Sequence, residues 1–183
     1  MTARTFAADH RERYLEELKA LLRIPSVSAV PAHRGDIART AEWLREHLAG
    51  LGFQSEVISL ENGHPIVYAD WMRAPGKPTV LFYGHYDVQP VEPLDLWTSP
   101  PFEPTIRGDD LFARGASDDK GQIFAIVKAL ESVLGATGAL PLNVKLLIEG
   151  EEELGSPGIN KWVERRGARR AACDFAWVSD GQL

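Results

Sequence analysis

The sequence predicts an α/β fold in which a mostly parallel sheet carries helices on both faces. Apolar runs typical of strands alternate with helical periodicities along the second half of the chain. This alternation is typical of right-handed crossover connections between parallel strands. The chain has 183 residues, of which 44% are hydrophobic and 25% charged. Length and composition therefore fit one globular domain with a buried core.

The sequence of the N-terminal part predicts two helices followed by a hairpin. Apolar residues recur every three or four positions over residues 6–23 and over residues 36–51, which predicts two amphipathic helices. Residues 57–60 and 66–71 are β-rich runs on either side of the turn pair Asn62-Gly63. This pattern predicts an antiparallel hairpin.

The sequence of the rest of the chain predicts the parallel strands of the sheet. Residues 79–83 form a strand without polar alternation, as expected where helices cover both faces. Residues 88–110 contain five prolines, which predict a long irregular loop, and loops of this length are usually functional. The other expected elements are helices near residues 119–134 and 156–166 and strands over residues 144–148 and 175–178.

Composition excludes several classes of function. The chain has 20 Lys and Arg against 26 Asp and Glu, and the net charge of −6 disfavours binding to nucleic acid. No apolar run approaches the roughly 18 residues of a membrane span. The lone Cys173 cannot form an internal disulfide. We therefore expect a cytoplasmic protein with neither a nucleic-acid nor a membrane partner.

Acidic residues and one histidine follow the ends of three predicted strands, and a further acidic pair precedes a predicted helix. Ligands of open α/β sheets bind beyond the carboxyl ends of the strands, so we expect these groups to meet at one edge of the sheet. In chain order they are His85 with Asp87, the pair Asp118-Asp119, the run from Glu149 to Glu153, and Asp180.

Such a cluster predicts a metal site. Several carboxylates within a few ångströms repel one another unless a cation neutralises them. A histidine among carboxylates suits Zn²⁺, Mn²⁺ or Co²⁺ better than Mg²⁺ or Ca²⁺. Asp87 lies two residues after His85, on the same side of an extended segment. It can therefore accept the second N–H of the imidazole and set its tautomer.

Each group also has a simpler interpretation. Asp118 is a typical N-cap for the helix that follows, the glutamate run is typical of a solvated turn, and Asp180 is typical of a turn. The convergence of all four groups at one sheet edge favours the metal site over these separate roles. We interpret the other histidines, His10, His33, His47 and His64, as structural or solvated.

Five segments resemble a known family. Together they are similar to the N-terminal part of metallo-dipeptidases in the family of carnosinase, aminoacylase-1, acetylornithine deacetylase and succinyl-diaminopimelate desuccinylase, which are dizinc hydrolases. The segments are Leu-Leu-Arg-Ile-Pro-Ser-Val-Ser at 21–28, Tyr-Gly-His-Tyr-Asp-Val-Gln-Pro at 83–90, Trp-Thr-Ser-Pro-Pro-Phe-Glu-Pro at 97–104, Ala-Arg-Gly-Ala-Ser-Asp-Asp-Lys-Gly at 113–121 and Ile-Glu-Gly-Glu-Glu-Glu-Leu-Gly-Ser at 148–156.

The resemblance implies a role for each residue of the cluster. The implied activity is metal-assisted hydrolysis of the peptide bond in a dipeptide or short peptide, with two Zn²⁺ ions per site and Mn²⁺ or Co²⁺ as alternatives. Glu152 would take the proton of the attacking water and return it to the leaving amine. The bond between Asp118 and Asp119 is expected to be cis. The implied metal ligands are His85, Asp118, Glu153 and Asp180, and the implied catalytic residues are Glu152, as general base, and Asp87, which orients His85.

The resemblance also implies that the chain is a part of a longer protein. Residues 1–183 correspond to the N-terminal portion of the catalytic domain, without the lid and dimerisation domain and without the C-terminal part of the catalytic domain. We therefore expect the chain alone to be inactive and its uncovered core surface to favour homo-oligomers. Two alternatives stay open: an N-acyl-amino-acid deacylase, and a non-catalytic metal-binding remnant.

Overall fold

The computed structural model describes residues 1–181, apart from the side chain of Arg166. No helix in this part of the chain combines the length and the hydrophobicity that crossing a bilayer requires. The helices are α1 (Ala3–Asp9), α2 (Arg11–Leu22), α3 (Arg34–Gly50), α4 (Lys120–Thr137), α5 (Pro157–Trp162) and α6 (Ala168–Ala171). The strands are β1 (Gln54–Ile58), β2 (Ile66–Trp71), β3 (Thr79–His85), β4 (Thr105–Arg107), β5 (Asp110–Phe112), β6 (Asn143–Glu149) and β7 (Phe175–Val178).

Five of these strands form a mixed sheet in the order β1-β2-β6-β3-β7. β1 and β6 are both antiparallel to β2, whereas β3 is parallel to its neighbours β6 and β7. Within this sheet, β2 is therefore the one strand that runs against the other four. The predicted mostly parallel sheet is confirmed, and so is the predicted hairpin, which is formed by β1 and β2.

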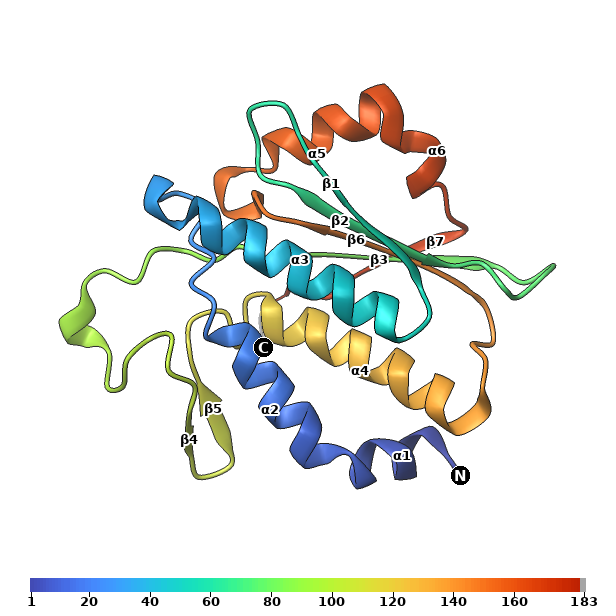
Figure 1. Cartoon of the computed structure of the whole chain (residues 1–183), viewed down its shortest axis with the longest axis horizontal. Coiled ribbons are helices and arrows are strands. Elements are labelled where there is room, and N and C mark those ends of the chain that lie inside the picture. The colour runs from blue at the N-terminus through green and yellow to red at the C-terminus, as the bar shows by residue number, and fades with distance from the viewer. Residues whose placement is uncertain (182–183) are drawn as a thin grey trace.

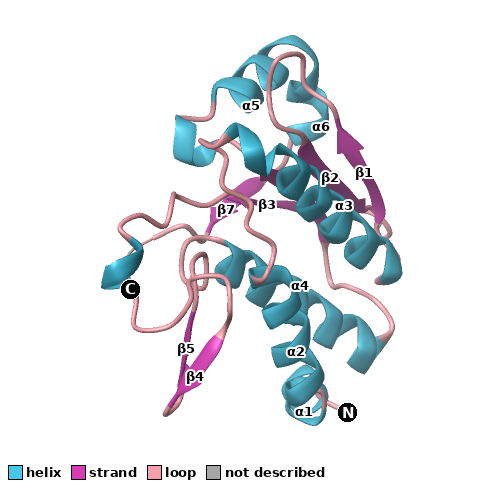
Figure 2. Cartoon of the chain, turned by 60° about the vertical axis from the view of Figure 1, so that its left-hand side comes forward, coloured by secondary structure: helices cyan, strands magenta, loops and turns pink. Residues whose placement is uncertain are grey.

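Helices cover both faces of the sheet (Figure 1). α3 and α4 pack on one face, with α1 and α2 against α4, and α5 and α6 lie on the other face (Figure 2). β2 divides its side chains between the two cores: Val67 and Ala69 belong to the larger core under α3 and α4, and Ile66 and Tyr68 to the smaller one under α5. This division follows from the alternation of side chains along a strand.

The predicted first helix is interrupted. α1 ends at Asp9 and α2 begins at Arg11, and the ring Nδ1 of His10 lies 2.8 Å from the carbonyl oxygen of Phe6. The apolar periodicity continues on both sides of His10, so it does not reveal a break of one residue.

Two later predictions also missed local detail. The long loop over residues 88–110 leads into a small hairpin of β4 and β5, whose turn contains Gly108 at a φ of +65°. Glycine adopts this left-handed conformation without steric cost, but the surrounding prolines dominated the sequence pattern. The helix predicted near residues 156–166 is α5 followed by a π-helical turn over Val163–Gly167.

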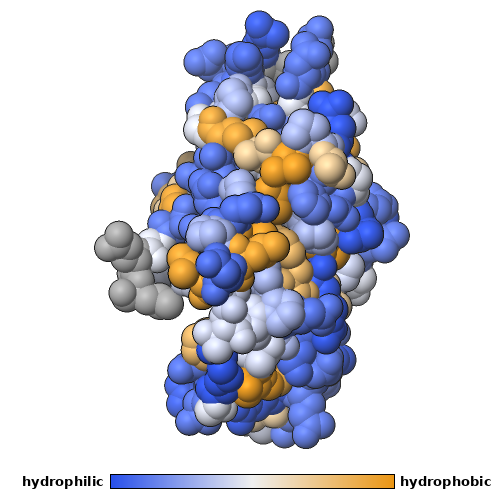
Figure 3. Space-filling model, turned by 90° about the vertical axis from the view of Figure 1, so that its left-hand side faces the viewer, coloured by the Kyte–Doolittle hydropathy of each residue, from blue (hydrophilic) through white to orange (hydrophobic). Residues whose placement is uncertain are grey.

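Apolar side chains remain exposed at the edge of the sheet and on the long loop. Phe175, Trp177 and Val178 of the edge strand β7 are all exposed, as are Leu94 and Leu96 on the loop. The end of the molecule that this loop forms shows separate apolar patches among hydrophilic side chains (Figure 3). Part of the apolar surface of this chain is therefore exposed.

Candidate metal centre

The structure brings the predicted site residues to one edge of the sheet. β3 ends at His85, which lies opposite Glu149 at the end of β6. Asp180 follows the end of the parallel neighbour β7, and Asp118 lies two residues before the start of α4. The carboxyl ends of parallel strands point the same way, which is why residues far apart in the sequence meet here.

His85 lies at the centre of an acidic cluster. Its side chain is fully buried, and its Nε2 lies 2.9 Å from Oδ1 of Asp118, 3.6 Å from Oδ2 of Asp180 and 3.9 Å from Oε2 of Glu152. Among the side chains that the structure describes, no lysine or arginine forms an ion pair with any of these three acids. No lysine or arginine of the described side chains thus balances the negative charge of the cluster.

Asp87 holds the other side of the imidazole. Nδ1 of His85 lies 3.0 Å from the backbone oxygen of Asp87 and 3.3 Å from its carboxylate Oδ1. The carboxylate of Asp87 also accepts the backbone N–H groups of Glu152 and Glu153, each at 3.2 Å. Asp87 is fully buried, so one side chain positions both the histidine and the glutamates of the cluster.

The free nitrogen of His85 fits a divalent cation. Nε2 is buried and, although Oδ1 of Asp118 lies 2.9 Å away, it forms no hydrogen bond of acceptable angle with the described residues. Because Asp87 accepts from Nδ1, a neutral ring presents the lone pair of Nε2 to carboxylate oxygens, and two acceptors repel unless a proton or a cation lies between them. Nitrogen with several carboxylate oxygens is a donor set that Zn²⁺, Mn²⁺ and Co²⁺ accept.

The pKa of His85 reflects the same electrostatics. Burial lowers this pKa, but the hydrogen bond to Asp87 and the charges of Asp87, Asp119 and Asp118 raise it to about 10. In the absence of a metal, the ring therefore holds a proton in the place where a cation would lie. Metal ligation needs the neutral imidazole, so a metal ion would displace that proton.

Glu153, the implied ligand of a second metal, is held by a neighbouring side chain. Its Oε2 accepts a hydrogen bond from Nε2 of Gln89 at 2.5 Å. Burial raises the pKa of Glu153, the Gln89 hydrogen bond lowers it, and the charge of Asp118 raises it, with a net increase. Glu152, rather than Glu153, joins His85 and Asp180 in a group whose ligand atoms all lie within 4.8 Å of one another.

The structure gives Asp119, the second member of the predicted acidic pair, a contact that the sequence did not indicate. Asp119 is fully buried, and its Oδ2 accepts the backbone N–H of His85 at 3.0 Å. Burial raises its pKa to about 7, although the hydrogen bond from His85 lowers it. The peptide bond between Asp118 and Asp119 is cis, which confirms the expectation. An aspartate before a helix is so often an N-cap that its position alone did not indicate this contact.

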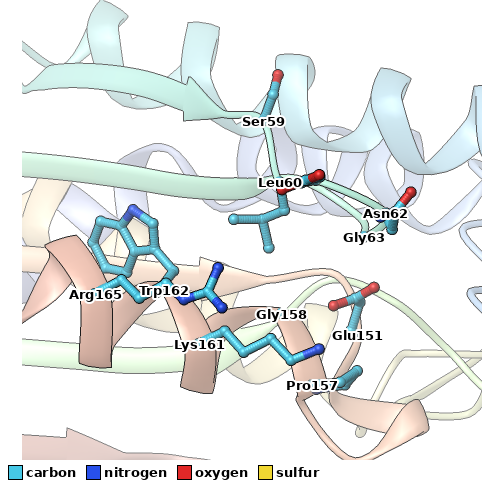
Figure 4. Close-up of a pocket in the computed structure, with 11 residues that line it drawn as sticks. Ser59, Leu60, Asn62, Gly63, Glu151, Pro157, Gly158, Lys161, Trp162 and Arg165 are labelled. Atoms are coloured by element: carbon cyan, nitrogen blue, oxygen red, sulfur yellow. The ribbon is translucent and has the colours of Figure 1, made fainter.

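A separate pocket lies on the α5 side of the β1–β2 hairpin. It has a volume of about 520 Å³, and none of the six predicted site residues lines it. Figure 4 shows the carboxylate of Glu151 directed toward Asn62 and Gly63 in the hairpin loop. Oε1 of Glu151 accepts the backbone N–H of His64 at 2.9 Å. Glu151 therefore braces the hairpin, whereas the next residue, Glu152, approaches His85.

An imidazole held on one side by a carboxylate and facing three more is typical of a metal-dependent hydrolase. The model of peptidase family M20/M25/M40 matches residues 81–182, which include all six predicted site residues. The chain belongs to this family. The resemblance found in the sequence is thereby confirmed.

Relatives of this M20 chain include dipeptidases and a desuccinylase. The human Beta-Ala-His dipeptidase is 32% identical over 186 residues, which cover 93% of this chain and 36% of that protein. The Cys-Gly metallodipeptidase dug1 of Schizosaccharomyces pombe is 30% identical and covers 93% and 38%. The succinyl-diaminopimelate desuccinylase of Delftia acidovorans is 36% identical and covers 88% and 42%. The chain thus spans less than half the length of these relatives.

Solved structures of the M20 family share the fold. Human carnosine dipeptidase 1 superposes with a TM-score of 0.92 at 30% identity, over 99% of this chain and 41% of that chain. The M20 family metallo-carboxypeptidase Sso-CP2 of Sulfolobus solfataricus gives a TM-score of 0.83 at 38% identity, over 93% and 38%. The predicted α/β fold with helices on both faces of the sheet is confirmed.

Proposed function

We propose that the complete protein hydrolyses the peptide bond of dipeptides or short peptides with the help of divalent metal ions. The observation that carries this proposal is the buried Nε2 of His85, which forms no hydrogen bond of acceptable angle with the described residues and faces three carboxylates. Membership of the M20 family and the dipeptidases among its relatives support the reaction and the substrate class.

We assign the ligands as follows. His85 and Asp180 would hold one metal ion, Asp118 would bridge two, and Glu153 would hold the second together with ligands outside this chain. Zn²⁺ is the proposed metal, with Mn²⁺ or Co²⁺ as alternatives, because the donor set combines one nitrogen with carboxylate oxygens. When bound, such ions polarise the scissile carbonyl and lower the pKa of a coordinated water.

Glu152 is the proposed general base. It lies at the edge of the cluster, half-buried, and its backbone N–H is held by the carboxylate of Asp87. From there its carboxylate can accept a proton from the attacking water and then donate it to the leaving amine. Asp87 positions the pair: it orients the ring of His85 and the backbone of Glu152 at the same time.

The most direct test is Glu152→Gln in the complete protein, because Gln keeps the size of the side chain but cannot carry the proton. We expect turnover of a dipeptide to fall at least about 10²–10⁴-fold, the usual contribution of a general base. Metal content, measured by atomic emission, should stay that of the wild type. Glu151→Gln is the matched control, since Glu151 braces the hairpin, and it should keep its turnover. Unchanged turnover in Glu152→Gln would remove Glu152 from the mechanism.

The desuccinylase among the relatives supports a second candidate, an N-acyl-amino-acid deacylase. Both reactions cleave an amide with the same groups, so the site itself does not distinguish them. A panel of dipeptides and N-acyl amino acids, tested with the metal-loaded complete protein, would distinguish the two reactions. Preferential cleavage of N-acyl amino acids would overturn the dipeptidase assignment in favour of the deacylase.

We further propose that residues 1–183 are the N-terminal portion of the catalytic domain and are inactive alone. The coverage of 36–42% of the relatives supports this proposal. Mass measurement of the natural gene product should give a chain much longer than 183 residues. A gene product of 183 residues would favour a non-catalytic, metal-binding remnant.

The cytoplasm is the proposed compartment, supported by the single cysteine. Assembly into homo-oligomers stays a prediction.

A further inference from the structure

The backbone of His85 lies at a point where the sheet stops supplying hydrogen-bond partners. Tyr86 donates its N–H to the carbonyl oxygen of Glu149 on the β6 side, at 2.8 Å. Successive amides of a strand point to opposite sides, so the N–H of His85 points toward β7. The pairing of β3 with β7, however, ends at Tyr83 and Val178. A partner for the N–H of His85 must come from outside the ladder.

Asp119 is that partner. Its Oδ2 accepts the N–H of His85 at 3.0 Å, and both residues are fully buried. Asp119 occupies the N-cap position of α4, yet its side chain makes no capping hydrogen bond. The carboxylate is therefore directed away from the usual role of an N-cap aspartate and toward the end of β3.

The residue before His85 leaves room for this contact. A Cβ atom added to Gly84 would lie 2.4 Å from Oδ2 of Asp119 and 2.1 Å from Cδ1 of Ile123. Any larger residue at position 84 would have to displace the side chains of Asp119 and Ile123. The glycine thus permits the close approach through which Asp119 reaches the backbone of His85.

We propose that Asp119 is a positioning residue for the metal centre: it fixes the backbone of His85 while Asp87 fixes the ring. This inference rests on the proposed function, because it assumes that His85 is a metal ligand. With the N–H bound to Asp119 and Nδ1 bound to Asp87, Nε2 is directed at the cluster before any ion arrives. An ion then binds without the cost of ordering its histidine ligand.

Two substitutions separate the hydrogen bond from the rest of the side chain. Asp119→Asn keeps a carbonyl oxygen that can accept from His85, and Asp119→Leu keeps the approximate volume but has no acceptor. Calorimetric titration with Zn²⁺ should give an affinity about 10–100-fold lower for Asp119→Leu, the usual cost of losing an outer-shell partner. Asp119→Asn should stay within about threefold of the wild type. The metal-free chain should also lose some thermal stability in Asp119→Leu, because the buried N–H of His85 loses its acceptor; the Zn²⁺ affinities are therefore compared below the unfolding transition of the less stable variant.

Hydrogen exchange of the His85 amide gives a readout that needs no metal. Protection should be lost in Asp119→Leu and retained in Asp119→Asn. If Asp119→Leu does not fold, Asp119→Ala serves in its place, since it also removes the acceptor but adds no volume, and it should show the same two losses.

Several results would overturn the inference. Wild-type Zn²⁺ affinity in Asp119→Leu would do so, and so would an affinity in Asp119→Asn as low as that of Asp119→Leu. A wild-type chain with no measurable Zn²⁺ affinity would instead overturn the proposed function. In that case, hydrogen exchange of the His85 amide would still test whether Asp119 accepts its hydrogen bond.

Discussion

Two clusters in this molecule each combine one histidine with two acidic side chains, but only one of them contains cationic side chains that balance the acids. In each, one histidine and two glutamate or aspartate side chains place their ligand atoms within 4.8 Å of one another. One cluster joins three helices, and the other lies at the carboxyl end of the sheet. The members are Glu17, His47 and Glu131 in the helical cluster and His85, Glu152 and Asp180 in the sheet-edge cluster.

The helical cluster contains its own cations. Nζ of Lys128 lies 2.6 Å from Nε2 of His47 and 2.7 Å from Oε2 of Glu131, and it also pairs with Glu17. Arg13 pairs with both glutamates. Burial raises the pKa of each glutamate, but the hydrogen bonds from Lys128 and Arg13 lower it by more.

The sheet-edge cluster has no such cation among the described side chains. Proximity of a histidine and acids therefore does not by itself define a metal site. What distinguishes the two clusters is whether a lysine or arginine already stands at the centre. We therefore propose that the helical cluster contributes to stability and that the sheet-edge cluster binds metal.

The largest expected effect concerns metal affinity. His85→Ala should lower the affinity for Zn²⁺ by more than about 100-fold, because even the loss of an outer-shell partner costs 10–100-fold. His47→Ala is the matched control and should bind Zn²⁺ like the wild type, since Lys128 excludes a second cation from the helical cluster. Titration calorimetry measures both affinities. Equal losses of Zn²⁺ affinity in the two variants would contradict the proposal that only the sheet-edge cluster binds metal.

The next effect concerns stability. Lys128→Met leaves two glutamates with Arg13 as their remaining cation, and the unfolding free energy should fall by about 3 kcal/mol, at the low end for a broken buried ion pair. Urea denaturation measures the loss. Lys19→Met, which removes a pairing with the exposed Glu16, is the control and should change stability much less. A Lys128→Met variant as stable as wild type would show that the lysine does not hold this cluster together.

The smallest effect concerns pH. Burial and the charge of Lys128 lower the pKa of His47, against the opposing charges of Glu17 and Glu131. The folded state thus favours the neutral ring, and this contribution is complete above the unfolded pKa of about 6.5 and lost as pH falls below it. Between pH 7 and pH 5, the unfolding free energy of the wild type should therefore fall more steeply than that of His47→Gln. Parallel curves would contradict the assignment of a neutral His47.

Most of the sheet-edge cluster was predictable because strand ends are visible in the sequence. The apolar runs before His85 and Asp180 end where the strands end, and parallel strands deliver their last residues to one edge. The break at His10 and the hairpin of β4 and β5 were not predictable in this way. Both depend on local backbone geometry that apolar periodicity does not report.

The sequence by itself determined the fold class, the edge of the sheet where the site lies and the family. Only the tertiary structure decided which neighbours meet: that Glu152 approaches His85, that Asp119 accepts the His85 amide, and that Lys128, 81 positions away in the sequence, lies against His47 and favours its uncharged form. The reason is physical. Periodicity sets the direction in which a side chain points along its own element, whereas contact and charge balance depend on how separate elements pack.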